Sequence, residues 1–304
     1  MNAIRWMGLE GVTSVLERTV RRISPVTYCA PLLAALACSE SSTSPAARSL
    51  QPALSVSAAT LTGRIVYTTG TIHVFNLATN TDVSLGVTGV NPKFSTDGTL
   101  ITYQNSGIKI MNADGTNQRL INPTGGVPSF NPAGTMIAYD DSGIWKINVD
   151  GTGRTQLTSD AGHWPAWSPD GTQIAYGAPV ALSKRTSTQQ VFIVNADGSN
   201  RQQVPTTGSV IDVVWQPSSR LLFGMSISSG SYDLYSYDPA NSSSLTRLTT
   251  SSDADFEPSW SPDGTQISWT SGTNRSGGIW TMNADGSGKQ GPVIPKARQG
   301  SWGQ

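Results

Sequence analysis

Cysteine and histidine are the scarcest chemically reactive residues in this chain of 304 residues. There are two of each, and both cysteines, Cys29 and Cys38, lie near the N-terminus. The remaining chain therefore offers no disulfide and no thiol chemistry. The two histidines, His73 and His163, are too few to build a multi-histidine metal centre.

Charge is also sparse, because only 13% of the residues are Asp, Glu, Lys or Arg. Residues 1–37 hold four basic and two acidic residues, so 16 basic and 18 acidic residues remain in the rest of the chain. A slightly acidic chain gives no bulk attraction to nucleic acid, which we therefore exclude as a partner. The chain also has no Gly-x-Ser-x-Gly segment, the signature of a hydrolase nucleophile.

The first 37 residues have the organisation of an export signal. Arg18, Arg21 and Arg22 precede a mostly apolar run over residues 23–37, which ends in small residues. The run is short and holds two prolines, so it does not read as a membrane span. The sequence Ala-Leu-Ala-Cys at 35–38 resembles a bacterial lipobox, which implies lipidation of Cys38. The alternative is an accidental apolar run in an unstructured tail.

Residues 38–60 are rich in Ser, Ala, Thr and Pro and contain almost no aromatic residues. Such a segment cannot bury enough apolar surface to fold, so we interpret it as a disordered tether. The expected location is the periplasm, either in solution or anchored to the outer membrane. The N-terminal lipid would be the protein's one attachment to the membrane.

A strand–turn–strand phrase occurs several times in residues 61–304. Residues 165–176 read Pro-Ala-Trp-Ser-Pro-Asp-Gly-Thr-Gln-Ile-Ala-Tyr, and residues 258–269 repeat them with few changes. Pro, Asp and Gly suit the positions of a tight turn, and the aromatic and β-branched residues on either side suit strands. Weaker copies occupy residues 92–103, 128–139 and 213–223.

A second phrase, Asn-Ala-Asp-Gly, alternates with the first. Its aligned first positions are Asn76, Asn112, Asn148, Asn195, Asp238 and Asn283, with spacings of 36, 36, 47, 43 and 45 residues. Repeats of about 40–50 residues that each hold four short strands are typical of propeller blades. We therefore predict an all-β fold, a six-bladed propeller of four-stranded antiparallel blades.

The first repeat lacks its first strand, since residues 64–67 match the second strand of the unit. The missing phrase occurs at the other end of the chain, as Gly-Ser-Trp at 300–302. We predict that this C-terminal strand joins the first blade and closes the ring, which removes open sheet edges. The propeller would then form one domain over residues 61–304.

Trp-Ser-Pro-Asp-Gly followed by Asn-Ala-Asp-Gly resembles the repeat of the TolB-type six-bladed propeller. The likeness extends over residues 64–302. TolB-type proteins carry an α/β domain before the propeller, whereas this chain has only the tether there. A role in the Tol–Pal envelope system therefore does not follow from the resemblance.

The loops divide between the two faces of a propeller. Every long loop, at 177–190, 226–232 and 271–278, falls on the face opposite the Pro-Asp-Gly turns, and binding residues concentrate on variable loops. The residues before each first strand should meet at the channel mouth on that face. The candidate binding residues are Asn91, His163, Trp164, Asp212, Asp255, Phe256, Glu257, Arg298 and Gln299.

This mouth allows three interpretations. Its carboxylates and amides could contact a partner, or they could hold a hard cation such as Ca²⁺, the one cofactor considered. Alternatively, the mouth is merely solvated, with Arg298 paired to Glu257. Trp164 and Phe256 could be apolar anchors for a partner or could simply pack between blades.

We favour a monomeric, non-enzymatic binding or scaffold module for a protein, peptide or glycan of the cell envelope. The rival hypothesis is a lyase or hydrolase that acts on polysaccharide, with Asp212, Glu257 and His163 as acid and base groups. A Glu–His–Asp cluster within hydrogen-bond reach would favour the rival.

Overall fold

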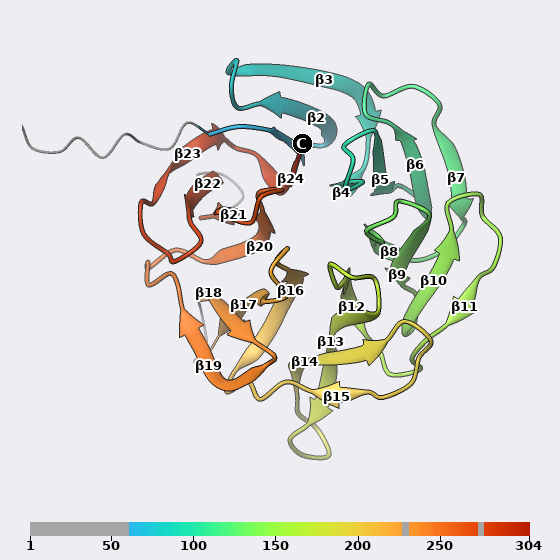
Figure 1. Ribbon diagram of the computed structural model, residues 1–304, viewed down its shortest axis with the longest axis vertical. Coiled ribbons are helices and arrows are strands. Elements are labelled where there is room, and N and C mark those ends of the chain that lie inside the picture. The colour runs from blue at the N-terminus through green and yellow to red at the C-terminus, as the bar shows by residue number, and fades with distance from the viewer. Residues whose placement is uncertain (1–60, 227–230, 273–276) are drawn as a thin grey trace, which may run out of the picture. The chain divides into compact units, whose positions relative to one another are not determined.

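The computed structural model describes residues 61–226, 231–272 and 277–304. The predicted export signal, the lipidation site Cys38 and the tether lie outside these residues. The described ranges form six antiparallel sheets of four strands each, arranged around a common centre (Figure 1). The predicted six-bladed propeller is confirmed.

The innermost strand of each blade lines the centre of the ring (Figure 1). In order from blade one to blade six, these strands are β24 (Arg298–Gly303), β4 (Val90–Phe94), β8 (Gly126–Phe130), β12 (His163–Trp167), β16 (Ser209–Trp215) and β20 (Asp255–Trp260).

The second and third strands of each blade continue outward from the centre. The second strands are β1 (Arg64–Thr68), β5 (Leu100–Gln104), β9 (Met136–Asp140), β13 (Gln173–Ala181), β17 (Leu221–Ser226) and β21 (Gln266–Ser271). The third strands are β2 (Thr71–Asn76), β6 (Ile108–Asn112), β10 (Ile144–Asn148), β14 (Ser187–Asn195), β18 (Asp233–Asp238) and β22 (Gly278–Asn283).

The outermost strands vary most in length. They are β3 (Thr81–Thr88), β7 (Arg119–Asn122), β11 (Thr155–Gln156), β15 (Gln202–Gln203), β19 (Asn241–Arg247) and β23 (Gln290–Pro295). No helix in the described part of the chain is long and apolar enough to cross a membrane.

The Pro-Asp-Gly turns owe their shape to their aspartates. Asp170 Oδ1 accepts hydrogen bonds from Ser168 Oγ at 2.6 Å and from the Thr172 backbone N–H at 3.0 Å. These donors favour the ionised carboxylate and lower the pKa of Asp170. Gly171 adopts the left-handed φ of +71° that the turn requires. The repeated Asp-Gly segments are therefore turns, as the sequence predicts.

Six apolar clusters hold the blades together, and each cluster includes side chains from two neighbouring blades. Every inner strand contributes one aromatic residue at an equivalent position to these clusters. Burial of large aromatic side chains dominates core energetics, so this repeated position fixes each blade against the next. The aromatic residues are Phe94, Phe130, Trp167, Trp215, Trp260 and Trp302.

The C-terminal strand closes the ring, as predicted. β24 pairs antiparallel with β1, where Ile65 lies opposite Trp302. The strand begins at Arg298, two residues before the predicted start at Gly300. Trp302 is buried between blades one and six, and its indole Nε1–H donates to the Thr62 backbone oxygen at 2.9 Å. The two ends of the propeller thus share one blade.

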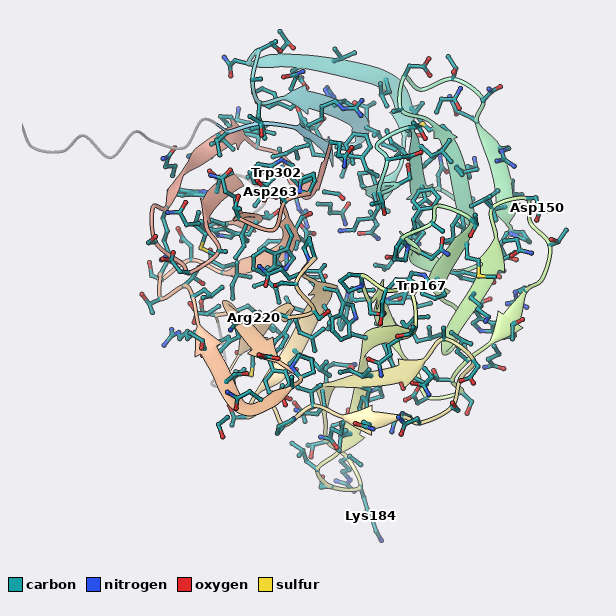
Figure 2. The ribbon with its side chains drawn as sticks, in the orientation of Figure 1. Asp150, Trp167, Lys184, Arg220, Asp263 and Trp302 are labelled. Carbon is teal, nitrogen blue, oxygen red and sulfur yellow. The ribbon has the colours of Figure 1, made fainter. Side chains whose placement is uncertain are left out.

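Blade four differs from the prediction of a long loop over residues 177–190. Strands β13 and β14 continue their pairing through that segment, as far as Ala181 opposite Ser187. Only residues 182–186 form the tip, where Leu182 is 69% exposed (Lys184 is labelled in Figure 2). The β-branched and Gln residues on either side of the tip allow β13 and β14 to extend beyond the rest of the sheet. The other two predicted long loops lie partly outside the described residues.

Candidate binding site in the central channel

Six residues occupy equivalent positions near the start of the inner strands, and we call them the mouth ring. All six have left-handed backbone conformations, with φ between 45° and 56°. At each of them the pairing of the inner strand with its neighbour shifts register. Such a bulge redirects a side chain away from the regular alternation of a strand. The mouth ring comprises Asn91, Val127, Trp164, Asp212, Glu257 and Gln299.

Hydrogen bonds connect four members of the mouth ring in sequence around the channel. The Glu257 backbone N–H donates to Asp212 Oδ2 at 3.1 Å, and the Gln299 backbone N–H donates to Glu257 Oε2 at 2.8 Å. The Asn91 backbone N–H donates to Gln299 Oε1 at 2.9 Å. In each case the side chain of one blade accepts the backbone N–H of the next. These polar residues therefore have a structural role in joining blades five, six, one and two.

Burial and charge change the protonation of this arc. Burial, and after it the neighbouring carboxylate of Glu257, raise the pKa of Asp212 to about 7, against the opposing effects of the hydrogen bond from Glu257 N–H and of the Lys93 charge. Lys93, two residues after Asn91, is close enough to both carboxylates to interact with them electrostatically. Burial lowers the pKa of Lys93, and Asp212 and Glu257 partly offset that effect.

The predicted residues on blade four form a separate group. His163 Nδ1 lies 3.0 Å from Asp140 Oδ2, and its ring centroid lies 5.5 Å from that of Trp164. The half-buried Trp164 ring packs against the backbone of Gly177, where a Cβ atom would lie 2.8 Å from the indole. His163 thus pairs with Asp140, a residue absent from the sequence-based set, and no hydrogen bond joins it to Asp212 or Glu257 among the described residues.

The predicted residues on blade six and the closing strand lie in different surroundings. Asp255 is buried, and its carboxylate accepts hydrogen bonds from Trp269 Nε1 at 3.0 Å and Ser251 Oγ at 3.2 Å. Phe256 and Arg298 line a small recess of about 10 Å³. Arg298 makes no ion pair with Glu257 in the described ranges. The predicted pairing of these two residues is therefore wrong.

The carboxylate and amide oxygens of the mouth ring are the groups that would bind the predicted cation. Within residues 61–226, 231–272 and 277–304, no three His, Cys, Asp or Glu side chains come close enough together to hold a metal ion. Asp212 Oδ2 and Glu257 Oε2 already accept backbone hydrogen bonds. A Ca²⁺ site here would have to recruit amide oxygens from Asn91 or Gln299, and it stays a prediction.

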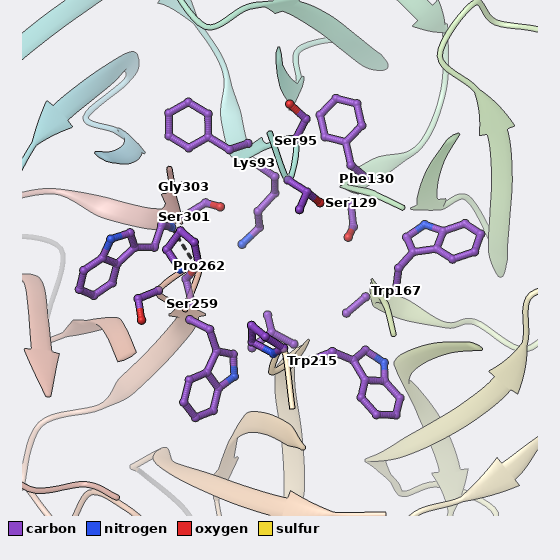
Figure 3. A pocket seen from close by; sticks show the side chains of 18 of the residues that line it. Lys93, Ser95, Ser129, Phe130, Trp167, Trp215, Ser259, Pro262, Ser301 and Gly303 are labelled. Atoms are coloured by element: carbon purple, nitrogen blue, oxygen red, sulfur yellow. Dashed lines mark hydrogen bonds between the residues drawn. The ribbon is translucent and has the colours of Figure 1, made fainter. Parts of the chain in front are cut away.

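A cavity of about 250 Å³ occupies the other part of the channel, next to the Pro-Asp-Gly turns (Figure 3). Its walls are the inner strands beyond the mouth ring, together with turn residues such as Thr96, Pro217 and Pro262. The C-terminal residue Gln304 also lines it. The cavity therefore opens on the face opposite the one that loop variation favoured.

The chemistry of the cavity comes from one position of the repeat, two residues after each member of the mouth ring. Figure 3 shows the Lys93 side chain extending into the open space, with Ser129, Ser259 and Ser301 around it. Ala166 and Val214 occupy the same position in blades four and five. One ammonium group and three hydroxyls thus face a partly apolar channel.

Lys93 is not among the binding residues that the sequence predicts. The signal was present in the repeats, because the equivalent position holds Ser, Ala or Val in the five other blades. A lysine that occurs at this position in only one blade is not needed to form the repeat. The strand and turn phrases show what the blades share, so they do not single out the one blade that differs at this position.

Comparisons with known proteins agree with this architecture. A family model described as the TolB β-propeller domain matches residues 88–304. A crystal structure of TolB from Acinetobacter baumannii superposes with a TM-score of 0.67 at 16% identity, over 79% of this chain and 66% of that one. This chain therefore covers just under two thirds of the length of that protein.

Two other solved structures share the fold at low identity. One chain of a nidogen/laminin complex matches with a TM-score of 0.63 at 15% identity, over 78% of this chain and 97% of that one. Hydrazine synthase from Kuenenia stuttgartiensis gives 0.63 at 15% identity, over 79% and 46% respectively. The family model covers more than half of the sequence and agrees with the observed blades, so this chain belongs to the TolB β-propeller family.

Proposed function

We propose that this protein is an exported, non-enzymatic binding module of the cell envelope that captures a protein or peptide at its central channel. The observation that carries the proposal is the cavity of about 250 Å³ beside Lys93, which offers polar groups and space at the centre of a rigid ring. Binding residues held by a rigid scaffold are the usual basis of recognition. Membership of the TolB propeller family supports a location in the envelope.

A protein or peptide partner is favoured over a glycan. The nidogen/laminin complex is an assembly between proteins that includes a propeller of this fold. The mouth-ring residues Trp164, Asp212 and Glu257 would form a second contact region at the opposite end of the channel. The polysaccharide lyase or hydrolase hypothesis gains no support, because His163 lies with Asp140 and not with the two carboxylates that it would need.

Attachment to the membrane would depend on Cys38. If this residue is lipidated, the wild-type protein should fractionate with membranes, and Cys38→Ser should shift it to the soluble periplasmic fraction. Fractionation of cells that produce each form gives the answer. A wild-type protein already found in the soluble fraction would show that the signal is simply cleaved.

The proposal is tested by capture from an envelope extract on the immobilised full chain. Ser129→Trp places a large side chain in the cavity and should abolish retention of the partner. Leu182→Trp adds the same side chain to the exposed hairpin tip of blade four and should leave retention unchanged. Melting curves confirm that both variants fold. Equal retention by the two variants would contradict a role for the channel.

A further inference from the structure

The cavity contains a lysine that makes no hydrogen bond or ion pair with the described residues. Lys93 belongs to the inner strand of blade two, and its ammonium group points into the channel (Figure 3). Among the described residues, Nζ of Lys93 takes part in no hydrogen bond and no ion pair. A half-buried ammonium group normally finds an acceptor, because removal of its water is costly. No hydrogen bond or ion pair within the described part of the fold therefore explains why a lysine occupies this position.

Three serines line the cavity beside Lys93, and the hydroxyl groups of two of them, Ser129 and Ser301, make no hydrogen bond among the described residues. Ser259 Oγ accepts the Trp302 backbone N–H at 2.9 Å, which is a structural contact. Ser129 and Ser301 line the same cavity but donate to no acceptor in the parts of the chain that the structure describes. The cavity thus combines one positive charge with two available O–H donors, which is a set of groups that suits an anion.

The neighbouring carboxylates of Asp212 and Glu257 form no ion pair with Lys93. Asp212 and Glu257 are near enough to act on Lys93 electrostatically, but no oxygen of either lies within ion-pair distance of Nζ. One oxygen of each accepts a backbone N–H from the next blade. They hold the mouth ring together, and Lys93 faces the cavity beyond them.

The size of the cavity limits its occupant. Sites for drug-sized ligands usually enclose about 300–1,000 Å³. At about 250 Å³, this cavity suits a single side chain or the end of a polypeptide, with the remainder of the ligand outside. The indole of Trp215 adds apolar lining on one side, which suits the aliphatic part of such a group.

We propose that the cavity binds a carboxylate group of a partner polypeptide, with Lys93 as its counter-ion and Ser129 and Ser301 as hydrogen-bond donors. The carboxylate belongs either to an Asp or Glu side chain or to the C-terminus of the partner. This inference rests on the proposed function and specifies the chemistry of its ligand. Charge-assisted hydrogen bonds of this kind are roughly twice as strong as neutral ones.

The test uses the full chain and pairs of small capped probes. N-acetyl-aspartic acid α-amide is compared with N-acetyl-asparagine α-amide, and N-acetyl-alanine with its amide, while inorganic phosphate serves as a non-peptide anion. Binding is followed through ¹³C-methylated lysine resonances, since the chain has six lysines and the Lys93 signal is identified by its loss in Lys93→Met.

The carboxylate probes should shift the Lys93 resonance saturably, and their amide counterparts should not. Lys93→Met should weaken binding by at least about tenfold, as loss of a charge-assisted hydrogen bond predicts. Lys184→Met, at the exposed hairpin tip, should leave binding unchanged. If Lys93→Met does not fold, Lys93→Gln replaces it.

Three outcomes would overturn the inference: equal binding of acid and amide probes, undiminished binding to the folded Lys93 variant, or a response to phosphate alone. The capture experiment separates this inference from the proposed function. If Lys93→Met still retains the partner from the extract while Ser129→Trp does not, the channel binds a partner but not through a carboxylate. If the wild-type chain retains no partner, the proposed function itself fails.

Discussion

Gln299 and Asn91 form a reciprocal pair of hydrogen bonds, although 208 residues separate them in the chain. Gln299 Nε2 donates to Asn91 Oδ1 at 2.7 Å, and the Asn91 backbone N–H donates to Gln299 Oε1 at 2.9 Å. One residue belongs to the C-terminal strand and the other to blade two. The pair therefore strengthens ring closure at the channel mouth, in addition to the strand pairing of β24 with β1.

Removal of this pair should loosen the ring. Gln299→Ala deletes both hydrogen bonds, and a net contribution of about 0.5–1.5 kcal/mol for each predicts a loss of about 1–3 kcal/mol in unfolding free energy. Urea unfolding measures the change. Gln202→Ala, at an exposed position of β15, is the matched control and should have almost no effect. Equal midpoints for the wild type and Gln299→Ala would show that the pair does not contribute to closure.

The stability of the protein should depend on the protonation of Asp212. Its pKa of about 7 in the folded protein lies above the ordinary value of about 3.9 in an unfolded chain. Between these values the folded state holds a proton that the unfolded state releases. This residue's stabilising contribution is thus complete below about pH 4 and is lost as the pH rises through about 7.

Asp212→Asn should remove that dependence. The variant should be more stable than the wild type at pH 8, by on the order of 1–2 kcal/mol, and its stability should change less between pH 4 and 7. Asp170→Asn provides a contrast, since hydrogen bonds lower the pKa of Asp170 and its contribution is lost only as the pH falls. Parallel pH profiles for the wild type and Asp212→Asn would contradict the raised pKa.

Val127 should be the strained member of the mouth ring. Its φ is 45°, a conformation that a β-branched residue rarely adopts. Asn tolerates this region far better and occupies the equivalent place in blade two. Val127→Asn should therefore raise the melting temperature, with relief of about 1 kcal/mol of strain. Val90→Asn, one residue before the mouth ring, is the control and should give no gain. A lower melting temperature for Val127→Asn would show that packing of Val127 outweighs its strain.

Much of the fold could be predicted from the sequence because each blade repeats the same local chemistry. The Asp170 turn and its equivalents depend only on neighbouring residues, so the short phrase is sufficient to identify them. Ring closure could also be predicted, since residues 300–302 carry the phrase that the first blade lacks. The length of the blade-four hairpin could not, because a strand that continues beyond its sheet has the same composition as a polar loop.

The candidate site was harder to predict because it depends on side-chain partners. The sequence predicts the mouth-ring residues just before the inner strands, whereas they lie near the start of those strands, within them. The sequence also could not show that Asp212, Glu257 and Gln299 accept backbone N–H groups from the next blade. It equally could not show that Asp255 is buried against Trp269, or that His163 pairs with Asp140. The cavity beside Lys93 arises from six strands that are distant in sequence, so only their arrangement in space reveals it.

Site-specific photo-crosslinking tests most directly the claim that a partner binds at the central channel. A photoreactive phenylalanine analogue is placed in the full chain at Thr96, on the rim of the cavity, and separately at Leu182 and Val83, which are exposed elsewhere. After irradiation of cells, a crosslinked partner should form from Thr96 and not from the other two positions. Adducts from Leu182 or Val83 with none from Thr96 would contradict the proposed function.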